Sequence, residues 1–274
     1  MRPTMASEIA DRIRAAATLL LPLGTRQWLR AQQRRLGLHH TPVGAVDYGD
    51  LRRLTPISPV FGIDRSVPTI DRYYIEGFLA KHVADIRGAV LEMGDAAYTR
   101  RFGGGRVTRS DVLNYVAGNS EATIVGDLTT ADHIPANSFD CIILTQTLQM
   151  IFDVRAALQQ LHRILKPDGV LLVTSHGISR IARREGIDPW GEYWHFTGQS
   201  TRHLFGTLFP FDGLQIVTYG NVLSAAASLY GLAAADLTAH ELDYCDPNFE
   251  VIIAVRAQKR KSGPAVDLTE SGST

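Results

Sequence analysis

The sequence predicts an α/β fold: a doubly wound, mostly parallel sheet of seven strands with an antiparallel edge strand, preceded by an N-terminal helical extension. Two observations support this prediction. Short apolar runs alternate with helical patterns over most of the chain, which is typical of βαβ units. The first of these runs also end at acidic residues, as strands do where an open α/β sheet binds a ligand.

The first three predicted strands each end at a carboxylate. They cover residues 89–91, 106–111 and 122–125 and lead into Glu92, Asp111 and Asp127, respectively. Asp111 follows Glu92 by 19 residues, close to the roughly 20 residues that precede a ribose-binding acid in dinucleotide-binding folds. We therefore expect a cleft for a ligand with hydroxyl and amino groups at this edge of the sheet.

The order of these signals resembles that of class I S-adenosylmethionine-dependent methyltransferases, in which the first strand ends in Asp/Glu-x-Gly-x-Gly-x-Gly. The matching positions, spread over residues 85–258, are Glu92-Met-Gly94, Asp111, Gly126-Asp127, Phe139-Asp140 and Leu165-Lys-Pro-Asp-Gly169. The resemblance implies a Rossmann-like sheet and S-adenosyl-L-methionine as cofactor. It also implies that Glu92 and Gly94 lie under the methionine part of the cofactor. Asp111 would then hold the ribose hydroxyls, and Asp127 would bind the adenine amine.

Two positions depart from this pattern. The second and third glycines of the family's loop are replaced by Ala96 and Tyr98, although glycine is used where backbone must approach a ligand closely. Two readings of function therefore stay open. The first is a cofactor-dependent methyltransferase, and the second is a non-catalytic methyltransferase-fold protein that serves as a binding or scaffold module with a degenerate cofactor loop.

Composition limits the class of protein. The chain has 274 residues, of which 45% are hydrophobic, and it carries 28 basic and 28 acidic residues. The absence of net charge gives no support for a nucleic-acid substrate. Two cysteines are too few for a disulfide framework, so we expect a reduced, cytoplasmic protein. We predict three segments: a basic helical extension (1–55), a methyltransferase-like domain (56–258) and a disordered tail (259–274).

Residues 1–40 carry apolar residues at helical spacing, and arginine supplies most of their charge. A basic amphipathic helix of this kind could lie on an anionic membrane surface. The alternative, which we favour, is a helix packed on the main domain or on a second subunit, as in a homodimer.

A helix is predicted from Thr69 or Asp71, either of which could cap it, to about Ile86. Tyr73 and Tyr74 cannot both face the core, since neighbouring helix positions point about 100° apart. The resembling family uses this segment to close the substrate pocket. We therefore count Tyr74 among the candidate catalytic residues, with a hydrogen-bonded structural tyrosine as the alternative.

The fourth predicted strand, 141–144, runs into a polar stretch at the carboxyl end of a central strand. We expect Thr145 to contact the cofactor and Gln149 to orient an acceptor hydroxyl, with Gln146 also facing the cleft. A helix capped by Asp153 follows and ends at Lys166-Pro-Asp-Gly169.

The fifth predicted strand, 170–175, ends at His176. A loop rich in aromatic residues, 188–197, follows and contains Trp190, Trp194 and His195. Such a loop predicts an acceptor pocket, since aromatic faces stack on sugar or aromatic rings and exclude water. His195, and after it His176, are the candidate bases for removing a hydroxyl proton. No cluster of metal-ligating residues has the usual spacing along the chain, so no metal is expected.

The remaining elements complete the sheet. We predict helices over 200–209 and 221–242 and strands over 214–219 and 249–255, the last of them antiparallel at the edge. The prediction for the whole chain is O-methylation of a sugar hydroxyl or of a glycosylated or small-molecule acceptor. The acceptor class is an analogy with family members found beside glycan-building enzymes.

Overall fold

The computed structural model describes residues 25, 28, 32, 47–182 and 191–260. The chain forms two compact units, residues 1–53 and 54–274. In the first unit the described residues include one turn of 3-10 helix, η1 (Gly49–Leu51). Most of the predicted basic extension therefore lies outside the described residues, and its roles at a membrane or a subunit interface stay predictions.

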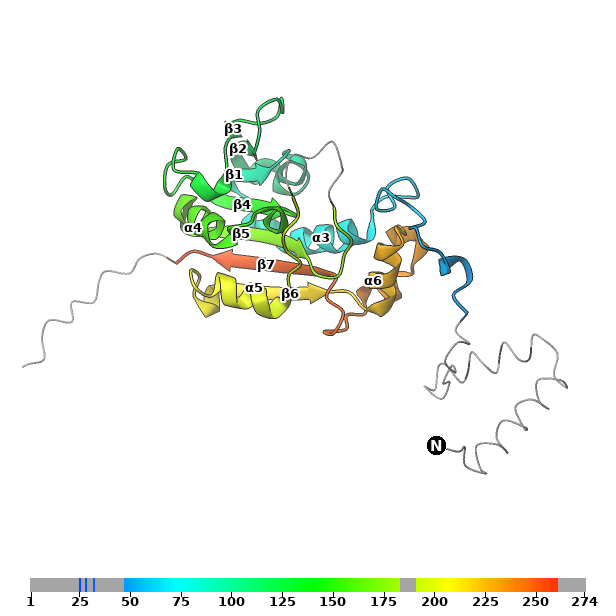
Figure 1. Ribbon diagram of the computed structural model, residues 1–274. Helices are drawn as coiled ribbons and strands as arrows, with labels where there is room; N and C mark the ends of the chain where they lie inside the picture. Colours follow the sequence, from blue (N-terminus) through cyan, green and yellow to red (C-terminus); the bar gives the residue numbers. More distant parts are fainter. Residues whose placement is uncertain (1–24, 26–27, 29–31, 33–46, 183–190, 261–274) are drawn as a thin grey trace, which may run out of the picture. The chain divides into compact units, whose positions relative to one another are not determined.

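The second unit is built on one sheet of seven strands (Figure 1). The strands are β1 (Gly88–Met93), β2 (Val107–Asn114), β3 (Ile124–Val125), β4 (Phe139–Thr145), β5 (Leu165–His176), β6 (Leu214–Tyr219) and β7 (Ile252–Gln258). Their order across the sheet is β3-β2-β1-β4-β5-β7-β6. The first five strands pair in parallel, and β7 is antiparallel to both of its neighbours. This confirms the doubly wound, mostly parallel sheet.

The antiparallel strand lies one position in from the edge. We expected the last strand to be the edge strand itself, but β7 enters between β5 and β6 and leaves β6 outermost. The sequence of β7 shows the physical reason, since its residues are buried on both faces except for Arg256 and Gln258. A strand that is buried on both faces belongs inside a sheet.

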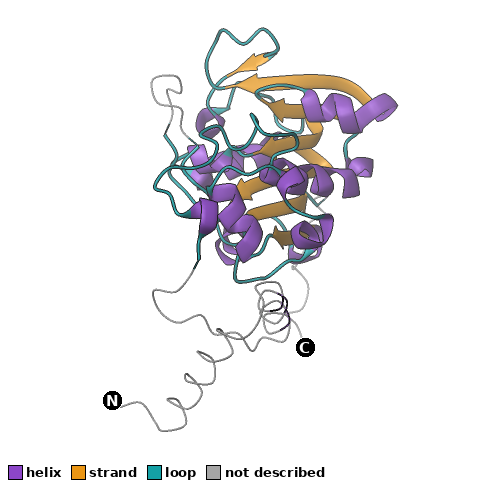
Figure 2. Cartoon of the chain, turned by 90° about the vertical axis from the view of Figure 1, so that its right-hand side faces the viewer, coloured by secondary structure: helices purple, strands orange, loops and turns teal. Residues whose placement is uncertain are grey.

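Helices cover both faces of the sheet (Figure 2). They are α3 (Ile70–Lys81), α4 (Val154–Ile164), α5 (Gly198–Phe205), α6 (Val222–Leu229) and α7 (Ala239–Asp243). Asp153 caps α4 by accepting the backbone N–H of Ala156, as predicted. Thr69 stands at the N-cap of α3 but makes no side-chain capping bond, and α3 ends at Lys81 rather than Ile86.

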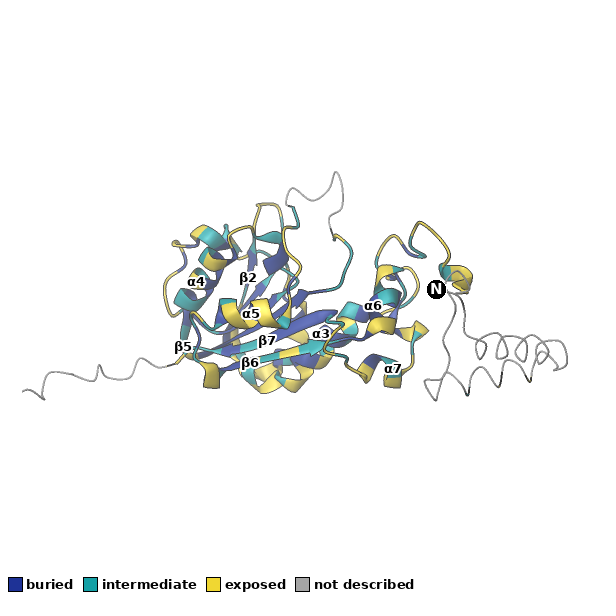
Figure 3. Cartoon of the chain, turned by 60° about the horizontal axis from the view of Figure 1, so that its bottom comes forward, coloured by how far each residue is buried: buried dark blue, intermediate teal, exposed yellow. Residues whose placement is uncertain are grey.

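The strands at the centre of the sheet are largely buried (Figure 3), and their alternating residues pack into two separate cores. In β4, Ile142 and Leu144 pack with α4 and α5, whereas Cys141 and Ile143 pack with α3 and α6. Successive side chains of a strand point to opposite faces, so a strand with apolar residues at every position serves both cores. Within the described residues, no helix has the length and the hydropathy needed to cross a bilayer.

The chain after β7 stays attached for two residues. Lys259, which we assigned to the disordered tail, extends its ammonium group to the carbonyl oxygens of His162 (2.8 Å) and Leu165 (2.7 Å) and to Asn137 Oδ1 (3.0 Å). The predicted boundary of the tail is therefore too early. Residues 261–274 lie outside the described residues.

Candidate active site

A cavity of about 700 Å³ opens at the carboxyl ends of β1, β4 and β5. Its wall also includes the loop before α3 and the first turns of that helix. Pockets for small ligands typically measure about 300 to 1,000 Å³ and favour this edge of a parallel sheet. The side chains of the wall that matter below are Glu92, Tyr98, Thr145, Gln146, Gln149 and His176.

Glu92 ends β1 as a buried carboxylate that holds the following turn. Its Oε1 accepts the backbone N–H of Tyr98 (3.0 Å) and its Oε2 accepts that of Thr99 (2.7 Å). Burial raises the pKa of Glu92, although these hydrogen bonds act in the opposite direction. The carboxylate therefore fixes the shape of the loop from inside, so its effect on a ligand passes through the backbone.

The loop after β1 has room at the first glycine of the motif. Gly94 has a φ of +82°, and a Cβ placed on it would meet no atom within 4 Å. The ring of Tyr98 is 7% exposed, stacks on Phe102, and its hydroxyl accepts a hydrogen bond from Arg72 of α3. The tyrosine that replaces the motif's glycine thus packs in the core, and its hydrogen bond with Arg72 links the loop to α3.

Asp111 and Asp127 do not line the cavity. β2 continues past Asp111 to Asn114, so the predicted strand end is wrong. The Asp111 carboxylate pairs with Arg109 Nε (2.8 Å) and accepts the hydroxyl of Thr123 (3.0 Å). Asp127 caps the short helix η5 (Leu128–Thr130) by accepting from Thr129. Of the three carboxylates expected to converge, Glu92 lines the cavity. The contacts predicted between the other two and the adenosyl group stay predictions.

The end of β4 supplies a pair of glutamines. Gln149 is 1% exposed, and its Nε2 donates to Gln146 Oε1 over 3.0 Å. Gln149 Oε1 and Gln146 Nε2 are both buried without a partner in the described structure. Exchanging the oxygen and nitrogen of both amides would still leave one donor and one acceptor unused. The pair therefore keeps one donor and one acceptor unused, buried within the cavity wall. Thr145 lines the same wall.

Gln146 holds an unusual backbone conformation. Its φ is +49°, a left-handed value that non-glycine residues adopt at some energetic cost, and its N–H donates to the carbonyl of Thr174 (2.8 Å). Such conformations persist where the surrounding structure imposes them, often at functional sites. The end of β4 is therefore shaped to bring two amides together.

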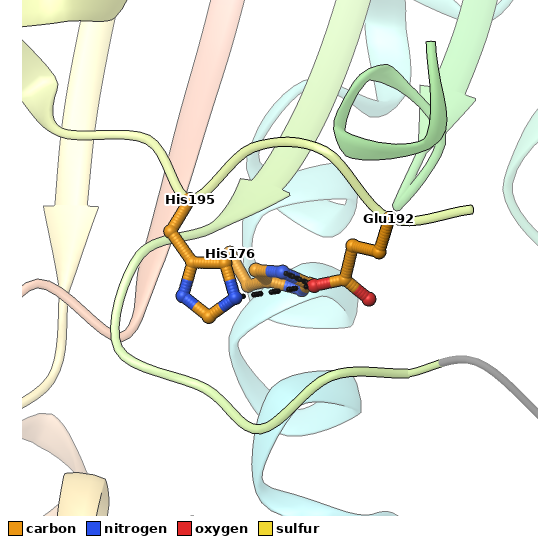
Figure 4. Close-up of side chains that lie close together, drawn as sticks. All are labelled: His176, Glu192 and His195. Atoms are coloured by element: carbon orange, nitrogen blue, oxygen red, sulfur yellow. Dashed lines mark hydrogen bonds and ion pairs between the residues drawn. The ribbon is translucent and has the colours of Figure 1, made fainter. Parts of the chain in front are cut away.

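Two histidines meet at one carboxylate beside the end of β5 (Figure 4). His176 Nε2 lies 2.6 Å from Glu192 Oε1, and His195 Nε2 lies 3.2 Å from the same oxygen. Burial lowers the pKa of the His176 imidazole, although Glu192 acts in the opposite direction. His176 lines the cavity. The structure thus brings both candidate bases together and adds Glu192, a residue that we did not predict.

Spacing along the chain indicated no metal-ligating cluster, but the fold brings three possible ligands together. The ligand atoms of His176, Glu192 and His195 all lie within 4.8 Å of one another. The spacing could not show this, because 16 residues separate His176 from Glu192. Backbone pairing closes that gap, since the Phe196 N–H donates to the carbonyl of His176 over 3.0 Å.

Tyr74 has a structural place. It is 3% exposed, its hydroxyl donates to the carbonyl of Leu242 (3.0 Å), and its ring stacks on Tyr219. The catalytic role that we considered for it is therefore corrected to packing between α3 and α7.

Two aromatic side chains of the loop lie at the surface. Tyr193 and Trp194 are 53% and 40% exposed and group with Phe152 on the surface. They do not contribute to the cavity wall. Trp190 lies outside the described residues. The cavity is thus formed by the strand ends and α3 without Tyr193 and Trp194, and an acceptor pocket in the aromatic loop stays a prediction.

Comparison with known proteins gives the following similarities. Residues 79–173 match the family described as methyltransferase domain. A ubiquinone/menaquinone biosynthesis C-methyltransferase, UbiE of Enterobacter sp. (strain 638), is 26% identical over 171 residues, which cover 54% of this chain and 61% of that protein. The rat protein named arginine-hydroxylase NDUFAF5, mitochondrial, is 31% identical over 78 residues, covering 27% of this chain and 23% of that protein.

Among solved structures, an S-adenosylmethionine-dependent methyltransferase from Mesorhizobium loti is similar, with a TM-score of 0.45 and 14% identity. It covers 72% of this chain and 100% of that one. The chain spans less than two thirds of the length of the curated relatives described above. Their printed names also differ in the reaction that they give.

Proposed function

We propose that this chain, whose residues 79–173 match the methyltransferase domain family, transfers a methyl group from S-adenosyl-L-methionine to an acceptor hydroxyl. The observation that carries the proposal is that the loop after β1 and the glutamine pair at the end of β4 line the same cavity. One side has the features of a cofactor site. The other side has the features of an acceptor site.

The residues at the end of β1 fit the cofactor. The open space at Gly94 admits a ligand against backbone, and Ala96 adds only a methyl group beyond glycine. Glu92 would keep the loop in shape, and Thr145 would border the bound cofactor. When bound, the cofactor supplies an electrophilic methyl group, and this chain's own contribution is to hold the acceptor in line with it.

The glutamine pair suits a hydroxyl acceptor. A hydroxyl group both donates and accepts, and Gln149 and Gln146 together leave one acceptor and one donor unused. An acceptor carbon would leave both amide groups unsatisfied, which is costly in a buried site. This supports oxygen as the acceptor atom.

The acceptor class is proposed as a sugar hydroxyl or a glycosylated or other small molecule. The cavity is large enough for one such molecule beside the methyl donor's reactive end, and its wall mixes charged, amide and apolar groups. We also propose a cytoplasmic location, which suits two cysteines present as free thiols. The role of His195 or His176 as the base stays a prediction, because the Nε2 atoms of both imidazoles contact the Glu192 carboxylate.

A second candidate, a binding or scaffold module without catalysis, is favoured by one observation. Asp111 and Asp127, which would hold the adenosine, have other partners and lie outside the cavity wall. A chain that had lost the adenosine contacts would keep its fold and its pocket and would bind the cofactor weakly.

Calorimetry separates the two candidates. We expect measurable heat and one site per chain with both S-adenosyl-L-methionine and S-adenosylhomocysteine. Incubation with methyl-labelled cofactor and a cell extract, followed by mass spectrometry, should then give a labelled methyl ether. No heat and no thermal shift with either compound would overturn the methyltransferase proposal. A label found on carbon would overturn the oxygen assignment alone.

A further inference from the structure

Three side chains with metal-ligating atoms converge from two separate stretches of the chain, and one of them, His176, lines the cavity. His176 is the last residue of β5, and Glu192 and His195 come from the segment before α5 (Figure 4). Glu192 lies at the centre, with the two imidazole nitrogens 2.6 and 3.2 Å from its Oε1. The possible ligands are therefore two imidazole nitrogens and one carboxylate oxygen.

We propose that His176, Glu192 and His195 bind one divalent transition-metal ion of the zinc class. Two imidazoles and a carboxylate are a common protein set for such ions, and three protein ligands leave a coordination position open. Ligands held about 2.0 to 2.2 Å from a tetrahedral zinc ion lie roughly 3.3 Å apart. The 3.2 Å between His195 Nε2 and Glu192 Oε1 is close to this value. The 2.6 Å between His176 Nε2 and the same oxygen is a hydrogen-bond distance, which must widen by about 0.7 Å to admit the ion.

The supports of the three ligands favour a built site over a chance contact. The Ala182 N–H donates to Glu192 Oε2 (2.6 Å), which leaves Oε1 to face the imidazoles. The backbone hydrogen bond from Phe196 to His176 fastens the segment of His195 to β5. Groups that orient ligands from outside in this way are typical of metal centres.

Charge also favours a cation. The Glu192 side chain is only 1% exposed, and a buried carboxylate is costly without a compensating positive charge. Among the ion pairs of the described residues, its partners are the two imidazoles and no lysine or arginine. A divalent ion would supply the missing charge and use all three groups at once.

The ion would lie at the wall of the catalytic cavity, because His176 is part of that wall. Metal binding by this cluster does not rest on methyl transfer. Where both proposals hold, the ion would provide positive charge for an acceptor oxygen. A bound ion would also occupy the imidazole nitrogens, so the base role predicted for the histidines would apply to metal-free protein only.

Metal binding can be measured on tag-free, full-length protein that has been stripped with EDTA and returned to metal-free buffer. We expect Zn²⁺ to bind with one ion per chain in calorimetry and to raise the melting temperature. Co²⁺ should give visible d–d absorption with a nitrogen- and oxygen-ligated spectrum. Absence of binding by both Zn²⁺ and Co²⁺ would overturn the proposal.

Variants test the ligands one by one. Glu192→Gln and His195→Gln should each weaken Zn²⁺ binding by roughly 100-fold or more. His82→Gln is the matched control, since His82 also lies near a carboxylate (Asp85, 3.6 Å) but outside the cluster, and it should bind as wild type. The His195 side chain is 36% exposed, so its variant should fold even where that of Glu192 does not. Unchanged affinity in both ligand variants would refute the site.

The two proposals fail separately. Calorimetry with S-adenosyl-L-methionine is repeated in EDTA. Cofactor binding without any metal binding removes only the metal site, whereas metal binding without cofactor binding removes only the methyltransferase proposal.

Discussion

At the scale of single residues, Tyr98 replaces a small residue of the loop with a structural anchor. Its ring is buried against Phe102 and its hydroxyl receives Arg72, so the side chain belongs to the core between α3 and β1. The family's motif has glycine at this position, where backbone approaches the ligand, and Tyr98 borders the cavity. The structure shows a ring that packs with α3.

Restoring the family's glycine should therefore damage the protein. We expect Tyr98→Gly to lower the free energy of unfolding by about 3 to 5 kcal/mol, the usual cost of deleting a large buried ring. Tyr98→Phe keeps the ring and should cost at most about 1 kcal/mol. Denaturant unfolding measures both, and a Tyr98→Gly variant as stable as wild type would show that the ring is dispensable.

Gln149 offers two tests, one of stability, which needs no acceptor, and one of acceptor turnover. Its side chain makes one hydrogen bond and keeps an unpartnered, buried oxygen, so Gln149→Leu should cost no more than about 1 kcal/mol of stability. Acceptor turnover should fall by roughly 10- to 100-fold, because the hydroxyl would lose its partner. A loss of several kcal/mol would mean that Gln149 serves the fold. The exposed Gln215 of β6 provides the control, Gln215→Leu.

At the scale of elements, Asp140 joins the starts of three strands. Its Oδ2 accepts the backbone N–H of Ala89 (2.8 Å) and the ammonium group of Lys166 (2.7 Å). Partial burial opposes its ionisation, but these bonds outweigh burial and lower the pKa of Asp140 below its usual value. The Phe-Asp pair of the motif thus has a structural explanation at the end of the sheet opposite the cavity.

A pH dependence follows for this carboxylate. A lowered pKa means that the ionised form adds stability above the pKa of the unfolded chain, near 4, and that this stability is lost in stronger acid. Asp140→Asn should cost about 1 kcal/mol at pH 7, because the contact is partly exposed. The difference from wild type should shrink as the pH falls below 4 in urea unfolding. A constant difference would exclude the ionised form as its cause.

Strand ends were the least predictable elements. Val112 and Leu113 continue β2 beyond Asp111 in register with β1. The predicted strand ended at Asp111 because an acid at that position fitted the motif. The apolar runs of β1 and β4 were predictable, since strands buried on both faces read as continuous hydrophobic stretches. The cluster around Glu192 was not predictable, because its members meet only when β5 and the segment before α5 pair.

At the scale of the whole molecule, β7 joins β6 to the rest of the sheet, and the residue after β7 binds a neighbouring helix and strand. Lys259 follows β7 and reaches two carbonyl groups at the end of α4 and Asn137 before β4. Burial lowers the pKa of its ammonium group. The Lys259 side chain thereby links the segment after β7 to the end of α4 and to the residues before β4.

We expect Lys259→Met to lower the midpoint of thermal unfolding, at a cost of about 1 kcal/mol, since three hydrogen bonds are lost but the site is partly exposed. Arg260→Met is the control, because the neighbouring Arg260 pairs with Asp212 at the surface and should change the midpoint little. Equal effects of the two substitutions would contradict an anchoring role for Lys259.

The insertion of β7 between β5 and β6 has a consequence for how the protein is made. During synthesis β6 leaves the ribosome before the strand that joins it to β5, so the growing chain holds an incomplete sheet with an unpaired apolar edge. Such edges invite association with other chains. The sheet stays incomplete until β7 has been made, and chaperone demand should therefore be greatest for chains released just before that strand.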